Sequence, residues 1–322
     1  MPEKKGVKEH GWLTFQYRNT GEPIRFPVGT VYGENDGPTL LVLGGMHGSE
    51  FAGIEAAIRL FNEVNPQKLK GVLKVGMMYN VPAFENNLGF LVPHDGKNPM
   101  STFPGSRLGT YGEAMAFYFN QEVLSKCDYF VELHGGDIPE ALTPFVMHLR
   151  SGDPDVDEKS RKMAEIYNIP LVVKGVQFSK DNPPHNAFGT AMMRGAPSML
   201  AESGQQGILK MEEVETHLTG LRNIMVHLGM MNGEIVNTVK RKFIENYTSI
   251  RSEHAGMWYP VVHLNQRVTT GEVVGYIRDY FGEPVAEVRA KLDGIVSMVR
   301  TSPAIKVGNT LIEHGFIASE ES

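Results

Sequence analysis

The sequence predicts an α/β protein in which helices flank a mixed sheet, followed by a smaller all-β part. Apolar runs bounded by Gly and Pro alternate with helical patterns from about residue 38 to about residue 235. After about residue 250 the helical period disappears, and short strands with Gly turns take its place. The 322 residues are enough for about two domains. We therefore expect one domain over residues 1–244 and a β-sandwich or barrel over residues 245–322.

The first strands are expected early in the chain. Residues 12–40 contain short alternating runs broken by Gly, Pro and Asn, which predict a β-rich N-terminal segment. PTLLVLGG, at 38–45, is an apolar run bounded by Pro and Gly, as expected of a strand buried on both faces. Residues 51–64 predict a helix, because their apolar side chains recur on one helical face: Phe51, Ile54, Ile58 and Phe61.

The same alternation continues through the rest of the first domain. Further strands are expected at 71–83, 127–136, 143–150, 169–175 and 196–203. Helices are expected at 156–168 and at 212–229, where Gly229 favours the end of the second helix. Strands that alternate with helices predict a largely parallel or mixed sheet covered on both faces. Ligands of such sheets bind outside the carboxyl ends of the strands, so functional residues are sought there.

The second domain is predicted from two similar stretches, residues 257–279 and 286–315. Each contains a strand, a polar turn, a V-x-x-G segment and another strand. The similarity indicates a small β domain built from two related halves. No Pro/Ser-rich linker precedes it, so we expect this domain to dock against the first.

Composition excludes several classes of function. Lys and Arg number 31 against 37 Asp and Glu, and the net charge of −6 argues against a nucleic-acid-binding protein. Cys127 is the single cysteine, which excludes an intrachain disulfide and a cysteine-based metal site. The N-terminal charges precede no apolar signal segment, and no apolar run approaches the roughly 18 residues of a membrane span. We therefore expect a cytoplasmic protein that binds neither nucleic acid nor membrane.

The strongest chemical signal is GGMHGSE, at 44–50, directly after the first buried strand. His47 and Glu50 are three residues apart in a Gly-lined turn that leads into a helix, so both side chains can point to one spot. His134, in VELHGGD, follows another apolar strand and is also flanked by Gly. Imidazole and carboxylate are ligands of catalytic zinc, which keeps a fourth position open for water. These three residues therefore predict one zinc ion per chain.

Zinc-activated water needs a neighbouring group that accepts its proton. Glu202, in MLAESGQQG, is the best candidate because it ends an apolar strand and precedes a Gly loop. The alternative for Glu202 is an ordinary loop carboxylate or a helix cap. Glu132 is two residues before His134, so the alternation of a strand places both on one side, where Glu132 can orient the histidine.

The other histidines have no comparable context. Two of them, His94 and His185, lie in loops rich in Gly and Pro, where they either face the site or have a structural role. Structural or surface roles are expected for His10, His148, His227, His254, His263 and His314.

In their order along the chain, these motifs resemble the succinylglutamate desuccinylase/aspartoacylase family, whose catalytic domain is related to zinc carboxypeptidases. GGMHGSE is similar to that family's G-x-H-G-x-E, and NVPAF at 80–84 to its N-x-P-A. HDG…FPG at 94–105 is similar to D-G…F-P-G, and VELHGG to D-L-H-G-G, with Glu132 in place of Asp. GAPSMLAESGQQG is similar to G-x-P…E-x-G. The resemblance covers nearly the whole chain, including the C-terminal β-rich part.

The resemblance implies a zinc carboxypeptidase-like fold with a smaller all-β domain. It also implies that zinc is held by His47, Glu50 and His134 and that Glu202 is the general base and acid. Relatives are often oligomeric, so the resemblance further implies a homo-oligomer.

The sequence departs from the family pattern at positions that hold substrate in relatives. The family usually has an Arg ahead of its P-x-D-G segment and an Asn-Arg pair before F-P-G. Without gaps, these positions are Phe90, Met100 and Ser101. In relatives the arginines bind a substrate carboxylate and polarise the scissile carbonyl, so their absence leaves open whether this substrate carries a carboxylate. The remaining candidates for substrate binding are Arg107, Arg194 and Asn80.

We expect a zinc-dependent deacylase that hydrolyses the amide bond of a small N-acyl compound. One alternative is a metallocarboxypeptidase acting on peptides or cell-wall fragments, which needs a carboxylate clamp that the missing Asn-Arg pair does not supply. Another is an inactive metal-binding protein on a hydrolase fold, which the lost arginines suggest and the intact ligand set argues against. The sequence leaves open the acyl group, the amine and the metal, since His and Glu also suit cobalt or manganese.

Overall fold

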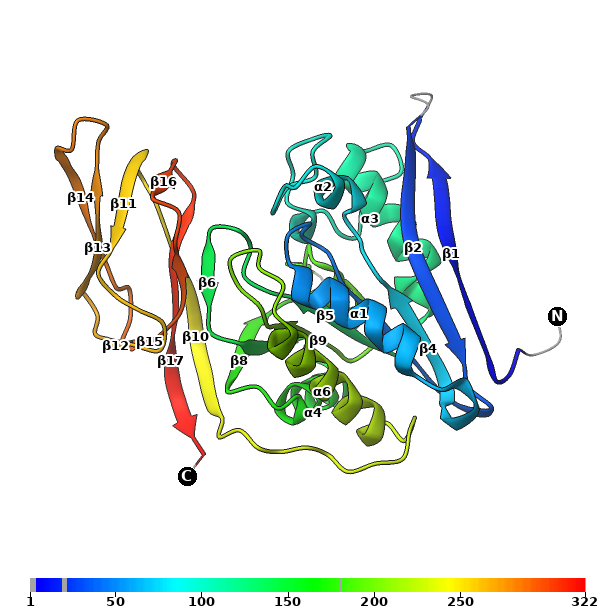
Figure 1. The fold of residues 1–322 in the computed structure, drawn as a ribbon. Coiled ribbons are helices and arrows are strands. Elements are labelled where there is room, and N and C mark those ends of the chain that lie inside the picture. Colours follow the sequence, from blue (N-terminus) through cyan, green and yellow to red (C-terminus); the bar gives the residue numbers. More distant parts are fainter. Residues whose placement is uncertain (1–3, 19–21, 180, 322) are drawn as a thin grey trace.

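The computed structural model describes residues 4–18, 22–179 and 181–321. It has one 13-stranded sheet with helices packed on it and a separate 4-stranded antiparallel sheet formed by C-terminal residues (Figure 1). The predicted class, a mixed α/β sheet with a smaller β part, is therefore confirmed. No helix among the described residues has the length and apolar character needed to cross a lipid bilayer.

Parallel pairing dominates the middle of the large sheet. The strands run in the order β1-β2-β4-β3-β5-β9-β7-β8-β10-β17-β15-β12, and β6 pairs with β15. The pairs β3–β4, β3–β5 and β5–β9 are parallel, whereas β7 is antiparallel to β9. The strands up to β9 are β1 (Val7–Gln16), β2 (Pro23–Tyr32), β3 (Asn35–Leu43), β4 (Lys70–Gly76), β5 (Tyr129–His134), β6 (Glu140–Leu142), β7 (Phe145–Arg150), β8 (Leu171–Gln177) and β9 (Ser198–Glu202).

Helices cover both faces of this sheet because alternate strand residues are apolar on both sides. In β3, Leu41 and Leu43 belong to the core that includes α3 and α5, whereas Leu40 and Val42 belong to the core that includes α1, α4 and α6. The helices are α1 (Phe51–Glu63), α2 (Val81–Glu85), α3 (Tyr111–Glu122), α4 (Pro154–Ile166), α5 (Ala187–Met192) and α6 (Met211–His227). Short 3-10 turns are η1 (Pro66–Lys68), η2 (Pro99–Ser101) and η3 (Leu124–Lys126).

The strand predicted at 71–83 is wrong beyond Gly76, because a short helix, α2, begins at Val81. The Asn80 side chain accepts a hydrogen bond from the Ala83 amide at 3.2 Å and so caps this helix. Pro82 favours the same outcome, since proline is accommodated in the first turn of a helix but cannot donate to a strand ladder.

The C-terminal strands continue the large sheet before they form the small one. β10 pairs in parallel with β8 through Lys242–Ile244, so the predicted boundary at 244/245 falls inside β10. A third core surrounds the buried Trp258. In Figure 1 these strands lie on the opposite side of the molecule from β1 and β2. They are β10 (Lys242–Arg251), β11 (Gly256–Pro260), β12 (Arg267–Val268), β13 (Val273–Arg278), β14 (Pro284–Arg289), β15 (Gly294–Arg300), β16 (Ala304–Ile305) and β17 (Thr310–Glu320).

Candidate active site

The structure brings His47, Glu50 and His134 together at the carboxyl edge of the large sheet. His47 and Glu50 lie in the turn between β3 and α1, and His134 is the last residue of β5. β3 and β5 are adjacent and parallel, so their carboxyl ends lie side by side. All three residues are buried, and one potential ligand atom from each lies within 4.8 Å of the others.

The carboxylate of Glu50 lies between the two imidazoles. Its Oε1 is 2.6 Å from Nδ1 of His47, and its Oε2 is 2.8 Å from Nδ1 of His134. Burial alone would raise the pKa of Glu50. The charges of the two histidines and their hydrogen bonds outweigh burial and lower this pKa to about 2. Glu50 is therefore a carboxylate at neutral pH, with both Nδ1 atoms facing it.

The outer ring nitrogens of the histidines face two further polar side chains. Nε2 of His47 is 3.1 Å from Oδ1 of Asn98, and Nε2 of His134 is 3.3 Å from Oε1 of Glu132. Glu132 is fully buried, and neither of its carboxylate oxygens has a hydrogen bond of good geometry. Metal-binding histidines commonly present one nitrogen to the ion and the other to a carboxylate or carbonyl oxygen.

These contacts fit a bound divalent ion. Two imidazole nitrogens and a carboxylate converge, and three protein ligands of these types suit zinc with an open position. Buried polar groups without partners are otherwise costly, and Nε2 of His134 lacks a well-aligned hydrogen bond, as Glu132 does. Sequence analysis did not single out Asn98, because its contact with His47 arises from the loop that η2 closes.

Glu202 lies beside this group, at the end of β9 and opposite His134 in the strand register. Its Oε2 is buried and has no hydrogen-bond partner. Burial raises the pKa of Glu202 well above its usual value. The positive charge of His134 acts against this increase, and the negative charge of Glu50 adds to it. Glu202 is therefore a carboxyl group that can hold or release a proton close to the histidines.

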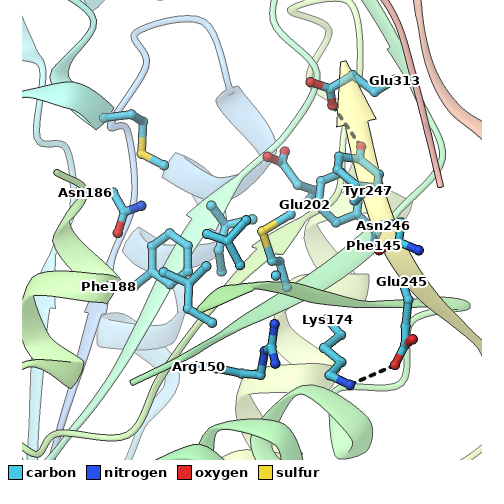
Figure 2. A pocket seen from close by; sticks show the side chains of 16 residues that line it. Phe145, Arg150, Lys174, Asn186, Phe188, Glu202, Glu245, Asn246, Tyr247 and Glu313 are labelled. Atoms are coloured by element: carbon cyan, nitrogen blue, oxygen red, sulfur yellow. Dashed lines mark hydrogen bonds and ion pairs between the residues drawn. The ribbon is translucent and has the colours of Figure 1, made fainter. Parts of the chain in front are cut away.

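A cavity of about 480 Å³ opens next to Glu202 (Figure 2). Much of its wall is apolar and comes from Met100, Phe145, Met147, Leu149, Phe188 and Leu200. The C-terminal strands β10 and β17 supply another part of the wall. Both the main sheet and residues after 244 therefore form this cavity.

Glu313 of β17 projects into the wall and is held by hydroxyl groups of β10. The Tyr247 hydroxyl donates to Oε2 of Glu313 at 2.8 Å, and the Ser249 hydroxyl donates to Oε1 at 2.8 Å. Figure 2 shows the first of these contacts above Glu202. Sequence analysis missed Tyr247 and Glu313, because neither follows a Gly-bounded strand of the α/β part and no motif marks them.

The positions where relatives carry Arg or Asn present little charge to the site. The ring of Phe90 packs edge-on against His47 with 5.1 Å between centroids, and Met100 lines the cavity. Ser101 is exposed, and its hydroxyl donates to the backbone oxygen of Asn98. The neighbourhood of His47 is therefore apolar on this side.

None of the three candidates for substrate binding lines the cavity. Asn80 is buried and caps α2. Arg107 is exposed in the loop before α3. Arg194 precedes β9, at the strand end remote from Glu202, and donates to Oδ1 of Asn120 at 2.6 Å. The cations that line the cavity are instead Arg150 and Lys174.

The remaining histidines include one that supports the site from behind. Nε2 of His217, on α6, is 2.9 Å from the backbone oxygen of His134 and 3.2 Å from that of Ser203. His217 thus links the ends of β5 and β9. Its position among apolar residues of a helix did not indicate this role in the sequence. His94 stacks on Tyr111 with 3.8 Å between ring centroids, outside the lining of the cavity beside Glu202. His185 does not line that cavity either.

The fold and the site together define an α/β protein with a buried His–Glu–His group and a neighbouring glutamate at one sheet edge. Residues 36–228 match the succinylglutamate desuccinylase/aspartoacylase catalytic domain, and the chain belongs to this family. The resemblance noted from the motifs is thereby confirmed.

Known relatives align over almost the whole chain. The N-alpha-acetyl-L-2,4-diaminobutyric acid deacetylase of Halomonas elongata is 28% identical over 319 residues, which cover 96% of this chain and 91% of that protein. A succinylglutamate desuccinylase structure from Silicibacter sp. TM1040 has a TM-score of 0.85 at 23% identity, covering 98% of this chain and 97% of that one. The product-bound ectoine utilization protein EutE (DoeB) from Ruegeria pomeroyi has a TM-score of 0.84 at 24% identity, with the same coverage. These two structures share the fold of this chain.

Proposed function

We propose that this protein is a zinc-dependent hydrolase that cleaves the amide bond of a small N-acyl compound. The observation that carries the proposal is the buried group of His47, Glu50 and His134 with Glu202 beside it on a cavity wall. The name of the Halomonas elongata relative describes a deacetylase of a small N-acetyl amine, which supports this reaction class.

In this proposal His47, Glu50 and His134 hold one zinc ion per chain. Zinc bound there supplies a Lewis acid that activates water and stabilises negative charge on the acyl oxygen. Asn98 and Glu132 lie 3.1 and 3.3 Å from the outer nitrogens of His47 and His134, and so favour the Nδ1 atoms as the zinc ligands.

Glu202 moves the proton. As a carboxylate it accepts a proton from the attacking water, and it then donates that proton to the departing amine nitrogen. The C–N bond breaks, and the products are a carboxylic acid and an amine. Burial favours the protonated form of Glu202, which suits the donation step.

Both predicted domains contribute to the site in this proposal. Residues 1–244 carry the zinc ligands and Glu202, and residues 245–322 complete the cavity with Tyr247 and Glu313. We place the reaction in the cytoplasm, where a chain with the single free thiol of Cys127 meets reducing conditions. The substrate is a small molecule.

Glu202→Gln tests the proposal, since it keeps the shape of the side chain but cannot accept the proton. We expect kcat on N-acetyl amines to fall by about 10²- to 10⁴-fold while zinc content stays at one per chain. Glu212→Gln, on the exposed first turn of α6, is the matched control and should leave kcat unchanged. Near-normal turnover of Glu202→Gln with zinc retained would contradict the role of Glu202.

The same measurements separate the alternatives. A metallocarboxypeptidase would cleave peptides with a free C-terminal carboxylate and leave simple N-acetyl amines intact. An inactive metal-binding protein would retain zinc and hydrolyse no member of a panel of N-acyl amines and peptides. The apolar ring of Phe90 beside His47, where relatives carry a cation, favours the deacylase over the carboxypeptidase.

A further inference from the structure

The cavity beside Glu202 has a second charged region. Arg150 of β7 and Lys174 of β8 line it on the side away from Glu313. Figure 2 shows the Arg150 guanidinium directed toward the apolar side chains of the cavity wall, with Lys174 next to it. This cation pair has no role in the chemistry assigned to Glu202 and the His–Glu–His group.

Arg150 lies at the end of β7, beside an irregularity in the pairing of β7 with β8. Along β7, Phe145, Met147 and Leu149 line the cavity, as alternate residues of a strand should. Arg150 comes directly after Leu149 and lines it too. The register between β7 and β8 shifts here. His148 is opposite Lys174 and Arg150 is opposite Gln177, so β8 has one more residue than β7 in this interval. Arg150 therefore borders this cavity at the strand end, where regular alternation stops, and irregular pairing of this kind is common beside active sites.

Arg150 is the less neutralised of the two cations. Lys174 makes an ion pair of 2.8 Å with Glu245. The hydrogen bond and the charge of Lys174, and then the charge of Arg150, lower the pKa of that carboxyl group. Nε of Arg150 is buried without a hydrogen-bond partner, and Nη1 makes one long contact of 3.5 Å with the neutral Gln177. Arg150, Lys174 and Glu245 together therefore leave one positive charge at this side of the cavity.

An apolar stretch separates this charge from Glu202. Phe145 is opposite Glu202 in the register of β7 and β9, and Arg150 is five residues further along β7. At about 3.3 Å per residue, the backbone of Arg150 lies roughly 16 Å from the level of Glu202. The side chains that line the interval include Met147, Leu149 and Leu200.

We propose that Arg150 binds a terminal carboxylate of the substrate, at the end of an apolar chain that starts at the scissile amide. The inference rests on the proposed function: Glu202 protonates the amine, so the amine and its substituent lie in the cavity that Glu202 lines. A guanidinium holds a carboxylate through two parallel hydrogen bonds. The substrate class is therefore the N-acyl derivatives of long-chain ω-amino carboxylic acids. In this proposal the carboxylate is bound far from the metal group. Phe90 and Met100, at the positions where relatives bind a carboxylate, supply no cation for it.

The kinetic test uses N-acetyl-ω-amino acids with two to eight methylene groups and the N-acetyl-n-alkylamines of equal length. We expect kcat/KM to rise about threefold to fourfold per methylene, until the carboxylate reaches Arg150. Arg150→Met should raise KM for the best carboxylate substrate by about 10- to 100-fold, with little change in kcat and none for the alkylamines. Arg150→Lys should recover part of the loss. Arg194→Met, at an exposed arginine that donates to Asn120 and does not line the cavity, is the matched control and should match the wild type.

Calorimetry separates this inference from the proposed function. The ω-amino acid product should bind the zinc-loaded wild type more tightly than the matching alkylamine, and Arg150→Met should abolish the difference. Equal binding of the two compounds, or hydrolysis that ignores the carboxylate, overturns the inference and leaves the proposed function standing. Carboxylate binding that depends on Arg150, without hydrolysis of any substrate, overturns the proposed function and leaves the carboxylate site standing.

Discussion

The two charged regions of the cavity differ in sign and in how the protein holds the charge. Near the metal group, Oε2 of Glu202 is buried without a hydrogen-bond partner, and Glu313 is fixed by two hydroxyl groups. At the other side, Arg150 and its neighbour Lys174 lie partly exposed at a bulge between β7 and β8. An acid whose oxygen is shielded from water suits proton transfer, whereas a cation with few partners suits recognition of a charged group that arrives from solvent.

The strongest test of this contrast neutralises Glu50. Glu50→Gln removes the negative charge between the two imidazoles and one ligand of the proposed zinc. We expect zinc affinity to fall by more than the roughly 100-fold typical of a supporting residue, and hydrolysis to fall to background. Zinc content after dialysis, measured by atomic emission, and turnover on an N-acetyl amine check both expectations.

The matched control for this variant is Glu55→Gln, at about one turn further along α1. It should retain zinc and activity. Circular dichroism of both variants establishes whether the fold persists. A folded Glu50→Gln variant with a full complement of zinc would show that the His–Glu–His group is not the metal site.

A smaller effect is expected from Glu132→Gln, which weakens the support behind His134 without removing a ligand. The carboxylate is 3.3 Å from Nε2 of His134, so its loss lowers the basicity of that imidazole and loosens its orientation. We expect zinc affinity to fall by about 10- to 100-fold, measured by competition with a chelator. Unchanged affinity would mean that Glu132 only fills space behind the histidine.

The smallest effect is expected from Glu313→Gln, which should shift the pH dependence of kcat/KM. Burial is the main cause of the raised pKa of Glu202, and the negative charge of Glu313 adds to it. Glu202 must be ionised to accept the proton from water, so activity falls as the pH drops through its pKa. Removing the charge of Glu313 lowers that pKa, and the acidic limb of kcat/KM should move to lower pH. Glu245→Gln, next to Lys174, should leave the limb in place; a shift to higher pH in Glu313→Gln would contradict the argument.

The sequence predicted the parts of the molecule that depend on local pattern. The apolar run before His47 and the run before His134 became β3 and β5, and parallel pairing brought their ends together. The predicted strand after Gly76 failed because Asn80 and Pro82 favour a helix start over a continued strand. The residue pattern within each segment thus decided whether it became a strand or a helix.

The cavity wall could not be predicted in the same way. Glu313 and Tyr247 reach the site because β10 and β17 pair with each other and β10 pairs with β8, a long-range arrangement without a sequence motif. Arg150 lines the wall directly after Leu149, at an irregular strand end that the alternation of β7 does not predict. Arg107 and Arg194, the candidates to replace the arginines of the family pattern, do not line the cavity, because nearness along the chain does not give nearness in space.

The position of β17 has a consequence for how the protein is made. This strand comes last in the sequence, yet it pairs with β10 and carries Glu313 into the cavity wall. A ribosome exposes the metal-binding motif and Glu202 long before it releases residues 310–320. The nascent chain can therefore assemble the His–Glu–His group early, but the wall beside it closes only after β17 has been made. A product truncated before β17 lacks Glu313, and its cavity stays open on that side.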